Sequence, residues 1–276
     1  MGRIEKRFAS LKADQRAGLI AYVSAGDPDP ATGYQILKGL PAAGADLIEL
    51  GMPFSDPMAD GPSVQMAGQR ALKAGITVDA TFDMVRRYRR EVDNETPILL
   101  MGYYNLVYQR GAERFCKEAA RAGIDGLILV DLPPEEVDEL KPHAAANGLD
   151  TVLLTAPTTD DKRLPAVLKY SAGFVYFVSV LGITGTKSAT EEAVRSHVAR
   201  IRRHTKLPIG VGFGIKTAEQ AAAVARHADA AVVGSAIVDR VRAGLDDKGR
   251  ATQQLVPSVL AYVKTLADGV RGVRKV

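Results

Sequence analysis

The chain has 276 residues, 46% of them hydrophobic and 25% charged, which is typical of a globular protein and unlike a disordered one. The formal net charge of +4 is small, and the basic residues lie on helix-like segments without interleaved aromatics, which argues against nucleic-acid binding. A single cysteine excludes an intrachain disulfide framework and a zinc–cysteine cluster.

The chain starts with a charged segment, MGRIEKRFASLKADQR, that lacks the apolar run of a secretory signal. Nowhere does an apolar run reach the ~18 residues that a membrane span needs. We therefore expect a soluble, cytoplasmic protein whose first residues form an extra N-terminal helix ahead of the first strand.

Eight short apolar runs follow along the chain and do not alternate with polar residues, a pattern typical of parallel strands covered on both faces. These predicted strands span 18–26, 46–51, 97–103, 126–132, 151–156, 174–180, 208–214 and 230–236. The predicted helices between and after them span 31–44, 81–92, 112–123, 135–148, 161–173, 190–204, 217–228 and 253–269. Thr217 with Gln220 three residues later predicts a capping box, and Asp79 or Thr81 is expected to cap the helix near residue 81.

Eight strand-then-helix units in a chain of this length predict an α/β protein with a single (β/α)8 TIM barrel as one domain, residues 1–276. An open doubly wound sheet is the alternative architecture. It would usually carry a G-x-G-x-x-G fingerprint after the first strand, where this chain has SAGDPDP.

Active sites of such barrels lie at the carboxyl ends of the strands. The polar residues predicted there include Ser24, Asp27, Glu49, Asp56, Asp60, Tyr103, Tyr104, Asn105, Asp131, Thr155, Tyr176 and Ser179. None of the four histidines falls at a strand end, so we expect no His-ligated metal site. No lysine falls within a predicted strand, which argues against a Schiff-base aldolase.

Glycine-rich turns follow the last three predicted strands, at 181–187, 212–217 and 234–238. Glycine lets the backbone approach a ligand closely, and the N–H groups at a helix start favour an anion. Because the loops after strands 7 and 8 of this fold often bind phosphate, we expect a phosphate site there, with Ser235 as a hydroxyl donor. Ordinary turn glycines are the alternative for any one of these turns.

Two acids lie in and after the second predicted strand, in LIELGMPFSDPMADGP. A carboxylate in a buried strand costs several kcal/mol unless it is paired, and burial raises its pKa toward values that suit proton transfer. Glu49 is therefore a candidate acid or base, although it could instead be a hydrogen-bonded acid that fixes a neighbouring loop. Asp60 could be an ordinary turn residue, and Tyr176 could be barrel core.

Together these segments closely resemble the tryptophan synthase alpha chain family. YVSAGDP, ELGMPFSDPMADGPSVQ, GYYN, VDLPPEE, GITGT, GFGI and VVGSAIV occur in the order of that family, over roughly residues 15 to 268. The resemblance implies retro-aldol cleavage of indole-3-glycerol phosphate to indole and D-glyceraldehyde 3-phosphate. That reaction needs neither a metal nor a Schiff base, because the indole ring accepts the electrons once its C3 atom is protonated.

The resemblance also implies roles for single residues. Glu49 aligns with the general acid/base, Asp60 with the acceptor of the indole N–H, and Tyr176 with a tyrosine of the indole pocket, all three in the catalytic group. Substrate-binding positions are Tyr22, Val64, Leu100, Leu127, Thr184 and Phe213, and phosphate-binding positions are Gly185, Gly214, Gly234 and Ser235. Tyr22 stands where many members have Phe, and segment 181–195 matches a loop that closes over the substrate.

The family implies a partner, the beta chain, in an α2β2 tetramer. The alpha chain carries no cofactor, and pyridoxal phosphate (PLP) is expected in the beta chain. The partner-facing segments would be Pro53–Gly61 and Tyr103–Arg110. A stand-alone indole-3-glycerol-phosphate lyase, a non-catalytic activating subunit and another phosphosugar isomerase are the alternatives, because fold alone does not determine function.

Overall fold

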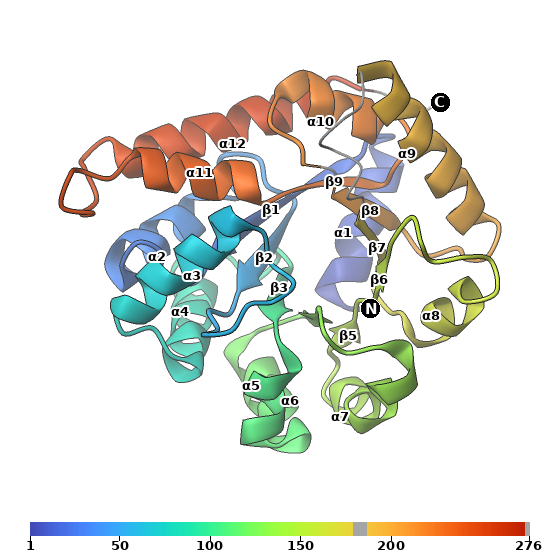
Figure 1. Cartoon of the computed structure of the whole chain (residues 1–276), viewed down its shortest axis with the longest axis horizontal. Helices are drawn as coiled ribbons and strands as arrows, with labels where there is room; N and C mark the ends of the chain where they lie inside the picture. Colours follow the sequence, from blue (N-terminus) through green and yellow to red (C-terminus); the bar gives the residue numbers. More distant parts are fainter. Residues whose placement is uncertain (179–186, 213, 274–276) are drawn as a thin grey trace.

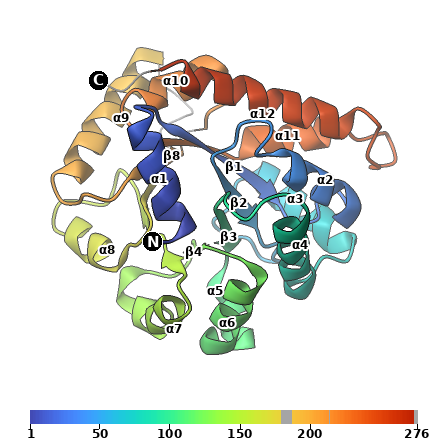
Figure 2. The same ribbon diagram turned by 180° about the vertical axis from the view of Figure 1, so that it is seen from behind.

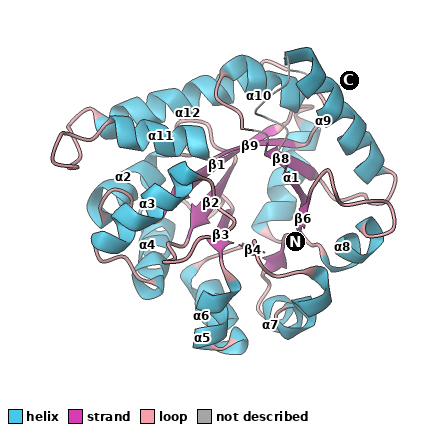
Figure 3. Ribbon diagram, in the orientation of Figure 1, coloured by secondary structure: helices cyan, strands magenta, loops and turns pink. Residues whose placement is uncertain are grey.

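The protein is described by a computed structural model that covers residues 1–178, 187–212 and 214–273, without the side chains of 187–190. The strands are β1 (Gly18–Ser24), β2 (Leu47–Gly51), β3 (Ile98–Gly102), β4 (Gly126–Leu129), β5 (Asp150–Thr151), β6 (Leu154–Thr155), β7 (Val175–Val178), β8 (Ile209–Gly212) and β9 (Ala230–Val233). These strands pair in parallel, in the order β5-β4-β3-β2-β1-β9-β8-β7-β6. Helices surround this curved sheet (Figures 1 and 3).

Most of the helices follow the predicted alternation, but three lie where the sequence predicted none: α3 (Pro62–Lys73), α5 (Tyr104–Arg110) and α11 (Ser235–Ala243). The other helices are α1 (Arg3–Ala13), α2 (Pro30–Gly39), α4 (Val78–Glu91), α6 (Ala112–Ala122), the 3-10 helix η1 (Pro134–Glu139), α7 (Lys141–Ala146), α8 (Leu164–Tyr170), α9 (Lys187–Arg202), α10 (Ala218–Ala225) and α12 (Leu255–Arg271). No helix in the described ranges is long and apolar enough to cross a bilayer.

The sheet ends on two very short strands, β5 and β6, which belong to one chain segment and are separated by Val152 and Leu153 alone. Val152 N–H donates to the carbonyl of Leu127 at 2.9 Å, on the β4 side, and the carbonyl of Leu153 accepts from Tyr176 N–H at 3.2 Å, on the β7 side. The predicted fifth strand is therefore split in two but joins both edges of the sheet. The predicted (β/α)8 barrel is confirmed, with this segment as its closure.

Two large apolar cores among the described residues result from the alternation of side chains along each strand, and a third, small cluster contains Tyr22, Ala67 and Val238. One lies inside the barrel and includes Ile20, Leu99 and Phe174, together with Ile4 and Phe8 of α1. The other lies between the sheet and the surrounding helices. Figure 2 shows α1 lying across the amino ends of the strands, and this is the predicted extra N-terminal helix.

Local signals in the sequence predicted some helix ends correctly. The capping box of Thr217 and Gln220 is formed at the start of α10. The expected cap at Asp79 or Thr81 is wrong, because Thr77 accepts from Ala80 N–H and α4 begins at Val78. Thr81 instead lies inside this helix, fully buried.

At the amino ends of the barrel strands, an aspartate recurs just before a strand and accepts a backbone N–H from the start of the neighbouring strand. Two of these aspartates are buried, and Asp229 is partly buried. The three pairs are Asp46 with Leu19 at 2.9 Å, Asp125 with Ile98 at 2.8 Å and Asp229 with Ile209 at 2.8 Å. Each aspartate also forms an ion pair, with Arg16, with Arg3 and Arg89, and with Arg202, respectively. These groups tie neighbouring strands together on the side where barrels of this kind gain stability.

We predict that Asp125→Asn lowers the free energy of unfolding by about 3 kcal/mol, because two arginines lose a carboxylate that lies 2.8 Å away and the Arg89 side chain is only 8% exposed. Urea denaturation measures the change. The control is Asp83→Asn, whose side chain is 71% exposed in its pair with Arg86 and whose loss should cost less than about 1 kcal/mol. Equal costs for the two variants would contradict this prediction.

Candidate functional site

A cavity of about 240 Å³ opens at the carboxyl ends of the strands. Described residues that line it are Tyr22, Glu49, Ala59, Asp60, Gly61, Val64, Met101, Tyr176, Val178, Gly212, Gly214, Ile215, Lys216, Val232, Gly234, Ser235 and Ala236. They come from β1, β2, β3, β7, β8 and β9 and the segments that follow them. Most of the predicted site residues thus meet in one place although they are far apart in the sequence.

Glu49 lies in β2, 2% exposed, and its side chain points into this cavity. Among the residues that the structure describes, its buried Oε2 atom has no hydrogen-bond partner. Burial, with the charge of Asp60 as a second cause, raises the pKa of Glu49 from 4.5 to about 8. The carboxyl group is therefore protonated at neutral pH and able to donate that proton.

Asp60 reaches the same cavity from the loop between β2 and α3. Its pKa is raised to about 6 by burial, while a hydrogen bond from the Tyr103 hydroxyl opposes the rise by stabilising the charged form. Asp60 is thus ionised at neutral pH, next to an acid that is not. Two carboxyl groups with separated pKa values in one cavity suit a proton donor and a stabiliser of positive charge.

Tyr22, which is buried, and Tyr176, which is partly buried, form aromatic walls of this cavity. Tyr22 pairs directly with Glu49 in the β1–β2 register, so the two side chains share the inner face of the sheet. Its hydroxyl lies over Gly51, where a Cβ atom would come within 2.3 Å of the oxygen, so only glycine leaves room for it. Burial raises the pKa of both tyrosines well above 10, which keeps both hydroxyls neutral hydrogen-bond donors.

The other end of the cavity is formed by turns after β8 and β9. Gly214 has φ of +62°, a conformation that favours glycine, and Ser235 begins α11 directly after Gly234. Backbone N–H groups at the start of α11 and the Ser235 hydroxyl suit an anion such as a phosphate. Lys216 also lines the cavity and was not among the expected site residues, although its place in GFGIKT directly after a glycine turn was a signal for it.

Leu100 and Leu127 do not line the cavity, and that expectation is corrected. Both side chains are fully buried in the outer core, between the sheet and the helices. The neighbouring Met101 points inward instead and lines the cavity. Side chains in a strand alternate between faces, so a shift of one residue exchanges inside for outside.

Val64, at the start of α3, lines the cavity as expected for a substrate-binding position. Thr184, Gly185 and Phe213 lie outside the described residues. Within the described ranges, His, Cys, Asp and Glu side chains form no group of three or more arranged to hold a metal ion. Cys116 is fully buried in α6, far along the chain from these groups.

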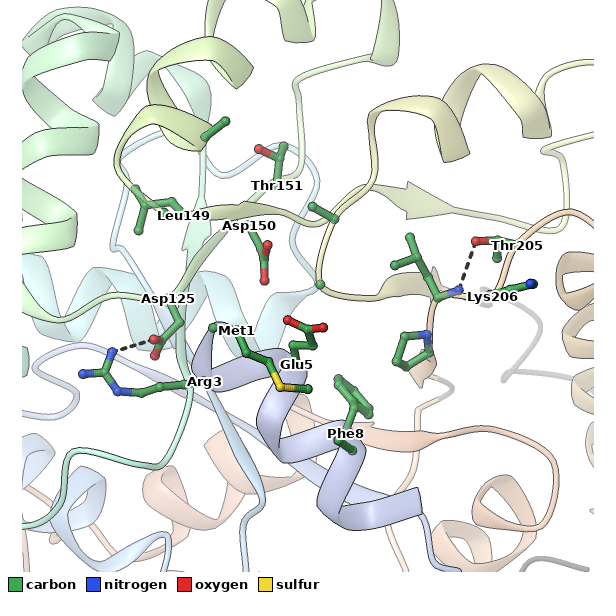
Figure 4. A pocket seen from close by; sticks show the side chains of 18 of the residues that line it. Met1, Arg3, Glu5, Phe8, Asp125, Leu149, Asp150, Thr151, Thr205 and Lys206 are labelled. Carbon is green, nitrogen blue, oxygen red and sulfur yellow. Dashed lines mark hydrogen bonds and ion pairs between the residues drawn. The ribbon is translucent and has the colours of Figure 1, made fainter. Parts of the chain in front are cut away.

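A larger cavity, about 910 Å³, lies at the opposite end of the barrel beside α1 (Figure 4). Asp150 and Glu5 face one another across it, and Arg3 pairs with Asp125 at its edge. Burial, with nearby Asp125 and Glu5, raises the pKa of Asp150 to about 6. Despite its volume we do not assign the reaction to it, because catalytic groups of this fold sit at the carboxyl ends of the strands, where Glu49 and Asp60 lie.

Comparison with known proteins points to one family. The model of the family "Tryptophan synthase alpha chain" matches residues 8–270. A tryptophan synthase alpha chain from Granulibacter bethesdensis is 55% identical over 274 residues, which cover 99% of this chain and 98% of that one.

Solved structures agree with this. Tryptophan synthase subunit alpha from Legionella pneumophila superposes with a TM-score of 0.90 at 37% identity, covering 99% of this chain and 100% of that one. A chain of the open form of tryptophan synthase from M. tuberculosis gives 0.84 at 33% identity, covering 98% and 99%. These matches, which span nearly the whole chain, show that it belongs to the tryptophan synthase alpha chain family, the lyases that cleave indole-3-glycerol phosphate.

Proposed function

We propose that this chain cleaves indole-3-glycerol phosphate with Glu49 as the group that moves protons and Asp60 as the group that stabilises the indole nitrogen. The observation that carries the proposal is the pair itself: a protonated, buried Glu49 and an ionised Asp60 line one cavity. Family membership supports the same reaction.

Glu49 alone can donate and recover the proton that the cleavage requires. The Glu49 carboxyl donates its proton to C3 of the indole ring, which leaves a carboxylate and a positive charge on the ring nitrogen. That carboxylate then takes the proton of the glycerol hydroxyl as the carbon–carbon bond breaks, and the bond electrons return to the ring. Indole and an aldehyde are released, and Glu49 is protonated again.

Asp60 acts where the charge develops. Its carboxylate accepts the indole N–H and stabilises the cation formed by C3 protonation, an interaction that is stronger in the transition state than in the ground state. Tyr22, Val64, Met101 and Tyr176 provide walls for the ring. Gly214, Gly234 and Ser235 would hold the phosphate, with Gly185 and Thr184 proposed to complete the site on substrate binding.

An alpha chain of this family implies a beta-chain partner. We propose that the assembly is an α2β2 tetramer in the cytoplasm, that PLP resides in the beta chain, and that Pro53–Gly61 and Tyr103–Arg110 contact it. Two exposed apolar side chains support these segments as an interface, Met58 at 79% and Tyr108 at 66% exposure.

Glu49→Gln should abolish indole release from indole-3-glycerol phosphate, since an amide neither donates nor accepts the proton at C3. The same variant should be more stable than the wild type at neutral pH. The pKa of Glu49 is about 8 in the folded state and 4.5 ordinarily, so proton binding by Glu49 stabilises the folded state. This stabilisation is complete only below pH 4.5 and is lost as the pH rises toward 8. We expect a gain on the order of 2 kcal/mol in urea denaturation at neutral pH. Full activity of Glu49→Gln would rule out the proposed mechanism.

The pH profile of kcat/KM, which reports the pKa values of the free enzyme, should be bell-shaped. Activity rises as Asp60 ionises near pH 6 and falls as Glu49 loses its proton near pH 8. Asp60→Asn should lower kcat roughly 100-fold or more. It should also move the alkaline limb to lower pH, because the charge of Asp60 is one cause of the raised pKa of Glu49. An unmoved or upward-shifted limb would contradict the electrostatic coupling.

Met58→Asp and Tyr108→Asp should each weaken beta-chain binding roughly 10-fold or more, because a charge replaces an apolar side chain in the proposed interface. Leu72→Asp is the control, since Leu72 is an exposed apolar residue of α3 outside both segments. Titration of the full chain with a beta chain measures the affinities. The interface assignment fails if the control loses as much affinity as the other two variants.

A further inference from the structure

Asp60 lies at the end of a tight turn on an exposed loop. Its backbone N–H donates to the carbonyl of Pro57 at 3.1 Å, which closes the turn Pro57–Asp60, and Met58 within this turn is 79% exposed. Loops with exposed apices fluctuate more than the elements they join. A charge that must meet a single N–H of the substrate needs its backbone held in place by something other than this turn.

Gln65 supplies such a restraint from α3. Its side-chain amide donates to the carbonyl of Pro57 at 3.2 Å and to the carbonyl of Asp60 at 3.0 Å. An amide NH₂ group has two hydrogens, so both are used, one on each end of the same turn. Gln65 is also anchored by its own backbone, whose N–H donates to Gly61 in the first turn of α3.

Tyr103 binds the middle of the turn. Its hydroxyl accepts the N–H of Ala59 at 2.9 Å, and its ring is 1% exposed and stacks on Phe54 with centroids 5.2 Å apart. The turn is therefore bonded at its first, third and fourth residues by side chains from two rigid elements, α3 and the end of β3. Among the described contacts of the turn, only the exposed Met58 has no hydrogen bond to one of these two side chains.

We propose that Gln65 is a positioning residue for catalysis, which sets the place of the Asp60 carboxylate by bridging the two ends of its turn. The inference rests on the proposed role of Asp60 and extends it to a side chain that does not line the cavity. The hydrogen bonds described for the Gln65 side chain go to two backbone carbonyl groups, so it acts on the reaction through the backbone of Asp60. Its removal should therefore affect kcat, where Asp60 works, and leave substrate binding nearly unchanged.

The test is a double-mutant cycle with Gln65→Met, which keeps the length and helix propensity of the side chain and removes both donors. We expect kcat for indole release to fall roughly 10- to 100-fold, the effect of a misplaced catalytic group, with KM changed by less than about twofold. In an Asp60→Asn background the same substitution should change kcat by less than about twofold, because there is no carboxylate left to position.

Gln69→Met is the matched control, an exposed glutamine on the same helix whose replacement should leave kcat at the wild-type value. If thermal unfolding shows that Gln65→Met does not fold, the cycle is measured with Gln65→Asn instead. The asparagine amide is one methylene too short to bridge the turn. Gln65→Asn should show the same split between kcat and KM.

The outcomes separate the two proposals. If Asp60→Asn keeps wild-type kcat, the role of Asp60 is wrong and the positioning role falls with it. If Asp60→Asn loses activity but Gln65→Met costs the same factor in both backgrounds, or raises KM and leaves kcat unchanged, the positioning role alone is overturned.

Discussion

The site depends on one costly feature, a carboxyl group inside the mouth of an apolar barrel. Glu49 avoids the full cost of a buried charge by staying protonated, because burial raises its pKa to about 8. Asp60, less buried and hydrogen-bonded to Tyr103, stays ionised. The difference in burial between two neighbouring acids thus leaves one protonated and the other charged, which is the pair of states that the proposed mechanism requires.

Three acidic side chains at the amino ends of the barrel strands are paired, whereas Glu49 at the carboxyl ends is not paired within the described residues. At the amino ends, Asp46, Asp125 and Asp229 are each satisfied by a strand N–H and an arginine, so these charges hold strands in register. At the carboxyl ends, Oε2 of Glu49 is left without a partner within the described residues. Even at the carboxyl ends the buried Asp27 is paired with Arg70, so among the described residues the oxygen without a partner is confined to the candidate site.

Much of the fold could be predicted because its signals are local. Continuous apolar runs identified the strands, and Thr217 with Gln220 identified a helix start. Helix α3 was missed, since glycine and polar residues weaken its pattern, and with it Gln65. Leu100 and Leu127 were assigned to the cavity wrongly, because a fully apolar strand has no alternation from which to read its inner face.

By itself the sequence determined that the chain is a barrel of parallel strands, that one strand carries an acid, and that glycine turns follow the last strands. Those properties depend on residue type and spacing alone. Only the tertiary structure decided that Glu49 and Asp60 share a cavity with separated pKa values, that Met101 lines it in place of Leu100, and that side chains from two elements clamp the turn of Asp60. Burial, register and contact are set by neighbours distant in the sequence, so no local pattern encodes them.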